Sequence, residues 1–325
     1  MKISRTVLSE CAKSRIRPAM RLKEKEITIE APWGKIRGLS WGDEGAPPVF
    51  LCHGKLDVCS GFRPLVRMLP EGFHYVSVDL PGNGKSDHLP PGVLLTAMDF
   101  VPTVRLVREH YRWHKFIYIG HSLGVVLGKF FNIAYPGHIS RMVELDPVPA
   151  HDSYRPDPAV IREWYHHFYH NYYGHEQYTK LNGGGDNAPK YSFEKALEMV
   201  MKNRSLHKEA AECILERAIA PAENGLYRFT HDQRMKRVMR FPLSGNAYGA
   251  IYTASKTPTF CVLAQHSIDV GMFDQTPFVK DTNAWPNKNY SFTIVEGRHD
   301  VHISHPELMA KDISQFLLKD LKSNL

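Results

Sequence analysis

The motif GHSLG at residues 120–124 could supply a nucleophile. It lies between a short apolar run, residues 116–119, and a helical pattern that follows it. The two flanking glycines permit a sharp strand-to-helix turn, which holds the hydroxyl of Ser122 clear of a sheet. The backbone N–H of Leu123 would then point to the place where an oxyanion forms. We predict that Ser122 is a nucleophile and that Leu123 contributes to an oxyanion hole.

A serine nucleophile needs a general base within reach. His299 follows the last apolar run of the chain, residues 291–295, in a loop that would emerge at the edge of a sheet. His302 is a rival three residues later. The chain order serine, acid, histidine favours the histidine that comes early in this loop, so we predict His299 as the base.

The base in turn needs an orienting carboxylate, and two are available. Asp269 follows the apolar run 259–264, whereas Asp146 ends the run 142–146. Asp269 is preferred because it fits the usual chain order and precedes His299 by 30 residues. Asp146 stays open as the alternative acid. Asp300 adjoins His299, which is a poor position for bonding its ring, and is expected at the surface.

A second oxyanion donor is expected in the turn His53-Gly54-Lys55, which follows the apolar run 49–52. The backbone N–H of Lys55 is the predicted donor. The ring of His53 is interpreted as tying down this loop. We also place His53 and His121 at the border of the substrate pocket.

Short apolar runs alternate with helical patterns, which predicts an α/β fold with a mostly parallel sheet. Residues 26–31 and 35–41 alternate apolar and polar side chains and predict an edge hairpin. Six further runs suit strands buried on both faces: residues 49–52, 74–79, 116–120, 142–146, 259–264 and 291–295.

The chain divides into a basic N-terminal extension (1–25), a core (26–146), an all-helical cap (147–255) and the rest of the core (256–325). Within the cap, residues 158–178 and 193–220 read as helices. Trp164 and Phe168 are predicted to line a substrate pocket.

His166 and His170 share a helix face with Glu163, a spacing that could hold a metal. Because no further ligand cluster is identifiable, we interpret this helix as an aromatic cap and predict no metal.

Composition excludes several classes of protein. The 325 residues are 43% hydrophobic and 23% charged, which is typical of a globular protein. Of the net charge of +7, eight basic and two acidic residues give +6 within residues 1–25, so the remainder carries about +1. We therefore predict no nucleic-acid partner.

No apolar run of about 18 residues exists, so no integral membrane contact is expected. The five cysteines form no CxxC pair.

The compartment is predicted to be intracellular. The N-terminus lacks the apolar segment of a secretory signal, and its basic character is weakly compatible with a mitochondrial presequence. Ser323-Asn324-Leu325 loosely matches a peroxisomal address. Cytoplasm and peroxisome are both predicted, with the mitochondrion left open. The oligomeric state is not predicted.

Five motifs in one order resemble a known family: APWGKI (31–36), HGKLD (53–57), GHSLG (120–124), LDP (145–147) and RFTHD (228–232). The chain resembles the serine hydrolase-like proteins of animals, the kraken-like group of the α/β-hydrolase superfamily, over about residues 25–322. The resemblance is weaker over 150–225. It implies an eight-stranded sheet with a helical cap and no metal or organic cofactor. Lys55 departs from the family, in which a bulky aromatic follows His-Gly.

These observations favour a serine hydrolase that cleaves a carboxylic ester or thioester of a small, largely hydrophobic molecule through an acyl-enzyme intermediate. Two alternatives on the same fold are a non-hydrolytic small-molecule binding protein and a cofactor-free lyase or oxygenase.

Overall fold

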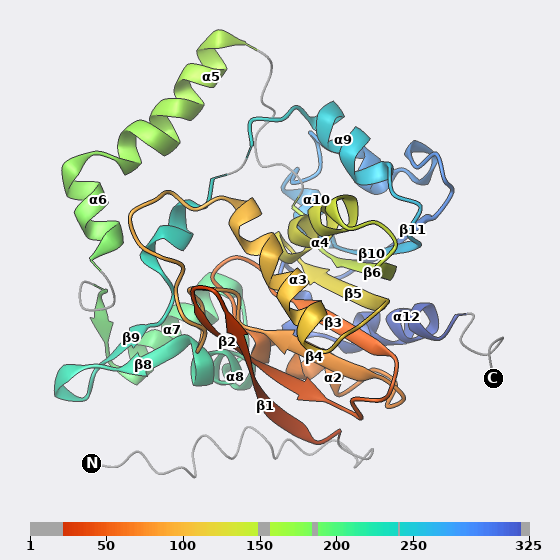
Figure 1. Cartoon of the computed structure of the whole chain (residues 1–325), viewed down its shortest axis with the longest axis horizontal. Helices are drawn as coiled ribbons and strands as arrows, with labels where there is room; N and C mark the ends of the chain where they lie inside the picture. Colours follow the sequence, from red (N-terminus) through yellow and green to blue (C-terminus); the bar gives the residue numbers. More distant parts are fainter. Residues whose placement is uncertain (1–21, 149–156, 184–187, 240, 320–325) are drawn as a thin grey trace.

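The computed structural model describes residues 22–148, 157–183, 188–239 and 241–319. The predicted basic extension up to residue 21 and the C-terminal tripeptide therefore lie outside the described residues. An eight-stranded sheet forms the centre, in the order β1-β2-β4-β3-β5-β6-β10-β11 (Figure 1). Its strands are β1 (Glu24–Ala31), β2 (Gly34–Trp41), β3 (Pro48–Cys52), β4 (His74–Val78), β5 (Phe116–His121), β6 (Ile139–Leu145), β10 (Thr259–Ala264) and β11 (Tyr290–Val295).

The sheet is mostly parallel, as predicted. β1 pairs with β2, and β2 with β4, in antiparallel register, while every later pair is parallel. The predicted hairpin is present as β1 and β2. The prediction that the other strands are buried on both faces holds for the central ones and is wrong for β11. That strand lies at the edge of the sheet, and its Ile294 is 46% exposed.

Helices cover both faces of the sheet because successive side chains of a strand point to opposite sides. In β3, Phe50 and Cys52 pack in one core with α3 (Val101–His110) and α4 (Leu123–Ala134). Val49 and Leu51 pack in a second core with α2 (Arg63–Val66) and α12 (Glu307–Leu318). α9 (Gly245–Thr253) packs over β10 and β11. Shorter helices are η2 (Cys59–Phe62), η3 (Ala97–Phe100), η6 (Glu223–Gly225), η7 (Gln233–Arg237), α10 (Gln265–Asp269), η8 (Pro277–Lys280), η9 (Thr282–Ala284) and α11 (Val301–Ser304).

The segment inserted after β6 contains most of the predicted cap. Its elements are α5 (Pro158–Tyr165), the π-helical turn η4 (His166–His170), α6 (His175–Asn182), α7 (Phe193–Arg204) and α8 (Lys208–Ala218). A small antiparallel sheet joins β7 (Lys190–Tyr191), β9 (Tyr227–Phe229) and β8 (Ile219–Pro221). The prediction of an all-helical insertion is therefore wrong, since strands of two or three residues are too short to show alternation. Across the described part of the chain, every helix is too short or too polar to span a bilayer.

Ion pairs join α8 to the sheet and to α2, and one of these pairs is fully buried. The Arg217 guanidinium lies 2.8 Å from Asp79, at the end of β4, and 2.7 Å from Glu26 of β1. Its neighbour Glu216 pairs with Arg63 at 2.6 Å. Arg217 and Asp79 have fully buried side chains, so each depends on the other for charge compensation.

Replacing Arg217 with Met keeps an apolar stem but leaves the carboxylate of Asp79 buried without its partner. We expect the free energy of unfolding to fall by about 3 kcal/mol, as measured by urea denaturation. Arg105→Met is the control, because Arg105 pairs with Glu109 on the exposed face of α3. That pair should contribute about 0.5 kcal/mol or less. Equal effects of the two substitutions would contradict a docking role for Arg217.

Candidate functional site

Ser122 occupies a strained turn between β5 and α4, where the sequence predicted a strand-to-helix elbow. Its φ of 51° and ψ of −113° lie in a region that residues other than glycine rarely adopt. The backbone N–H of Ser122 donates to the carbonyl of Leu145 at 3.1 Å, which fixes the turn against β6. Strain of this kind is typical of a nucleophile elbow.

The two glycines of the motif are needed because backbone segments approach one another closely. A Cβ on Gly124 would lie 2.1 Å from the carbonyl oxygen of Cys52, at the end of β3. A Cβ on Gly120 would lie 2.8 Å from the backbone of Gly124. The elbow can therefore pack against the end of β3 only when both positions lack a side chain.

We expect Gly124→Ala to lower the free energy of unfolding by about 1–3 kcal/mol, because backbone has to shift to admit the methyl group. Gly72→Ala is the matched control, since a Cβ there meets nothing within 4 Å. It should change stability by less than about 0.5 kcal/mol. Chemical denaturation of both variants measures this change. A free energy of unfolding that is the same in Gly124→Ala as in wild type would show that the backbone of Cys52 leaves room for a methyl group.

The His299 side chain, 33% exposed, meets Asp146 in the loops beyond β11 and β6. Its Nδ1 lies 2.6 Å from Oδ2 of Asp146, whose side chain is buried. Burial acts to lower the pKa of His299, but the hydrogen bond and the negative charge of Asp146 outweigh it and raise the pKa above its ordinary value. A carboxylate that accepts a hydrogen bond from the N–H of Nδ1 leaves Nε2 with the lone pair, as a general base requires.

The preference for Asp269 as the carboxylate partner is not supported, and the alternative Asp146 takes that position. The chain after β10 turns directly into α10, which carries Asp269 to its far end, where it accepts from Gln265 at 2.7 Å. The start of this helix instead supports Asp146. The backbone N–H of Ala264 donates to Oδ1 at 2.9 Å, and the hydroxyl of Ser267 donates to Oδ2 at 2.5 Å.

Asp146→Asn should slow covalent labelling of Ser122 by a fluorophosphonate by roughly 10³–10⁴-fold, because an amide that donates to Nδ1 forces the wrong tautomer of His299. Asp269→Asn should label at the wild-type rate, since it changes only a contact within α10. Labelling is followed by intact-mass spectrometry. If Asp269→Asn greatly slowed labelling and Asp146→Asn did not, the acid would be Asp269, as the sequence first indicated.

The loop after β3 reaches the elbow at Gly54, where a Cβ would lie 3.1 Å from that of Ser122. His53 is fully buried beside it. Its Nε2 accepts from the N–H of Leu80 at 2.9 Å, and its Nδ1 lies 2.7 Å from the carbonyl of Gly54. The ring therefore ties down the loop, as interpreted, and its place at the border of the substrate pocket stays a prediction. The Lys55 ammonium donates to the carbonyl of Lys236 at 3.0 Å. The oxyanion roles of Lys55 and Leu123 stay predictions.

His121 is buried beside the elbow, and its place at the border of the substrate pocket stays a prediction. Its ring lies 4.7 Å from the ring of His299 and 4.1 Å from that of His302, between centroids. His302 is buried in α11, and neither of its ring nitrogens has a hydrogen-bond partner among the described residues, so the predicted choice of His299 over His302 agrees with the geometry. Burial lowers the pKa of His302 to about 4, and of His121 well below its ordinary value.

Sequence reasoning missed a charge network beside these rings. Asp300 was expected at the surface, but it is buried and accepts two hydrogen bonds from Arg204 of α7. Arg204 also donates to Oδ1 of Asp57 at 2.7 Å. No sequence motif joins these residues, because Arg204 lies 96 positions from Asp300 and 147 positions from Asp57. For Asp57, the available signal in the sequence was its place as the last residue of the HGKLD motif (53–57).

The inserted segment presents apolar surface. Trp164 and Phe168 are half-buried against a cluster formed by Leu94, Tyr172, Leu181 and Met239, so their predicted pocket role stays a prediction. A cavity of about 820 Å³ lies between α5 and residues 242–244. Its walls include Pro158, Ile161, Tyr165, Pro242 and Leu243. Glu163, His166 and His170, the conceivable metal site of this helix, are exposed.

A family model described as alpha/beta hydrolase fold matches residues 47–306. The chain is 29% identical over 305 residues to a serine hydrolase-like protein of Danio rerio, covering 92% of this chain and 90% of that protein. It is 28% identical to serine hydrolase-like protein 2 of Homo sapiens, covering 90% and 93%. The resemblance to this group is confirmed.

Solved structures agree on the fold. A hypothetical protein from Pseudomonas aeruginosa PAO1 superposes with a TM-score of 0.74 at 23% identity, covering 90% of this chain and 98% of that one. A thioesterase domain from the curacin biosynthetic pathway superposes with a TM-score of 0.70 at 19% identity, covering 90% and 99%.

Proposed function

Because the chain belongs to the alpha/beta hydrolase fold family, we propose that it is a serine hydrolase that cleaves a carboxylic ester or thioester through an acyl-enzyme intermediate. The names of its relatives support a hydrolase. The observation that carries the finer proposal is the 2.6 Å contact between His299 and Asp146, which belong to loops at the same sheet edge as the strained Ser122.

In this mechanism Nε2 of His299 removes the proton of the Ser122 hydroxyl while Oγ attacks the substrate carbonyl carbon. Asp146 accepts from Nδ1 throughout, which holds the ring and stabilises the imidazolium. The carbonyl oxygen gains negative charge, and the backbone N–H groups of Leu123 and Lys55 are the proposed donors to it. Losing one such donor typically raises a barrier by roughly 3 kcal/mol.

The proton on His299 passes to the departing alcohol or thiol as its bond to the acyl carbon breaks. Water then enters, gives a proton to His299 and attacks the acyl carbon. His299 returns this proton to Oγ of Ser122 as the bond between Oγ and the acyl carbon breaks, and the acid leaves. No cofactor takes part in this proposed sequence.

The proposed substrate is small and largely hydrophobic. Its support is the apolar wall of the open hollow between α5 and residues 242–244, which has a volume of about 820 Å³. The lining of this hollow does not include Ser122, His299 or Asp146, so it supports the apolar character of the inserted segment and not the position of the reacting carbonyl. Tyr165 and Ile161 supply much of this wall and remain 52% and 39% exposed. An acyl chain or an aromatic ester that covered them would remove apolar surface from water.

The test is covalent labelling of the purified chain with a fluorophosphonate, read by intact mass. Wild type should gain one adduct, Ser122→Ala should gain none, and His299→Ala should label several orders of magnitude more slowly because the hydroxyl lacks its base. Ester and thioester panels of graded chain length then identify the substrate class.

Ser314→Ala is the control for loss of a serine, because its hydroxyl bonds only within the α12 helix among the described contacts. It should label like wild type. A well-folded wild type that neither labels nor hydrolyses any panel member would contradict the proposal. Binding or turnover that survives Ser122→Ala would favour the binding-protein or lyase alternative.

A further inference from the structure

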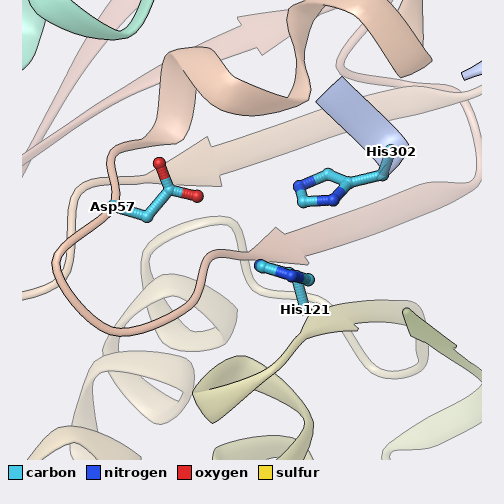
Figure 2. Close-up of side chains that lie close together, drawn as sticks. All are labelled: Asp57, His121 and His302. Carbon is cyan, nitrogen blue, oxygen red and sulfur yellow. The ribbon is translucent and has the colours of Figure 1, made fainter. Parts of the chain in front are cut away.

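Three buried side chains from separate parts of the chain converge next to the site. Asp57 lies in the loop after β3, His121 at the end of β5, and His302 in α11. Figure 2 shows the carboxylate and the two rings gathered around a common space. One potential ligand atom from each residue lies within 4.8 Å of the other two. All three residues are 2% exposed or less.

Four of the six polar side-chain atoms of this cluster lack partners among the described residues. Oδ2 of Asp57, Nδ1 of His121 and both ring nitrogens of His302 are buried without a hydrogen bond there. Buried polar groups normally have partners, so each such atom calls for a ligand. Nε2 of His121 lies 3.0 Å from the carbonyl of His299, which can only accept, so Nε2 carries the hydrogen and Nδ1 the lone pair.

The charge of the surroundings is favourable to a cation. Asp57 and Asp300 contribute two negative charges, and the guanidinium of Arg204 that bonds to both contributes one positive charge. One uncompensated negative charge therefore remains beside the two neutral rings. Arg204 engages Oδ1 of Asp57, which leaves Oδ2 for another ligand.

We propose that Asp57, His121 and His302 bind a divalent transition metal ion of the Zn²⁺ type. Two imidazole nitrogens and one carboxylate oxygen form a donor set that zinc accepts, with a fourth position for water. Zinc–ligand bonds of about 2.0–2.2 Å require donors roughly 3.3–3.5 Å apart, so each side chain has to move by less than about 1 Å.

A metal ion there would join the three loops that carry the proposed chemistry. Asp57 is two residues from Lys55, His121 precedes Ser122, and His302 follows His299 by three positions. The site does not depend on the serine hydrolase proposal, because its donors lie beneath the elbow and none is assigned a step in the reaction. Its role is to hold these loops in register.

The test uses the full chain, stripped with EDTA and then titrated with ZnCl₂ in a calorimeter, with bound zinc measured by elemental analysis. Wild type should bind one zinc per chain, and its Tm should rise with zinc concentration. His302→Phe keeps an aromatic ring beside Phe62 but has no ligand atom, and it should bind at least tenfold more weakly with no zinc-dependent rise in Tm.

His74→Phe is the matched control, because His74 is also buried with both ring nitrogens unpartnered among the described residues, yet it belongs to no ligand cluster there. It should bind zinc like wild type. A His166→Ala/His170→Ala double variant controls for the exposed histidines of η4 and should also keep its zinc. Loss of zinc in either control, with retention in His302→Phe, would overturn the proposal.

X-ray absorption of the zinc-loaded wild type gives a test that needs no variant. Two imidazoles and oxygen donors are expected around the metal, and a shell of thiolate sulfur would contradict the site. A folded, EDTA-treated wild type that binds no zinc would also overturn it. None of these measurements involves ester hydrolysis, so they stand or fall separately from the labelling of Ser122.

Discussion

The guanidinium of Arg204 connects the parts of the molecule on which the site depends. It extends from α7 of the inserted segment to Asp57, beyond β3, and to Asp300, beyond β11. Because all three groups are largely buried, separating any pair would leave a charge in a low-dielectric interior. The loop of the proposed oxyanion donor Lys55 and the loop of the proposed base His299 are thereby held to one another. The inserted segment is thus part of the framework that holds these two loops together.

Close backbone packing imposes a second constraint at the same edge of the sheet. The elbow at Ser122 fits beside the end of β3 because Gly124 approaches the carbonyl of Cys52 and Gly54 approaches Ser122. Parallel strands in register bring their carboxyl ends to a common level, and this is where open α/β sheets carry their sites. The loops after β3, β5, β6 and β11 can meet there although they are far apart in the sequence.

The helices of the inserted segment are held to the rest of the protein by contacts of unequal strength. α8 is tied down by the buried pair of Arg217 with Asp79, and α7 by Arg204. In contrast, α5 and η4 contain no buried residue and meet the rest of the chain through half-buried aromatics such as Trp164 and Phe168. Segments with few buried contacts open at low free-energy cost. This arrangement gives a rigid base beside the sheet and a lightly held helix next to the apolar cavity.

Local patterns in the sequence predicted the parallel sheet, the hairpin at its edge, the elbow at Ser122 and the place of His299. These patterns are alternation, apolar runs, and a motif set between a strand and a helix. These patterns favoured Asp269 over Asp146 as the carboxylate partner. The contact between His299 and Asp146 depends instead on the tertiary fold, since α10 carries Asp269 away while its first turn supports Asp146. The same holds for the gathering of Asp57, His121 and His302, and for the burial of Asp300. Contacts between residues far apart in the chain depend on strand order and helix placement, which no local pattern records.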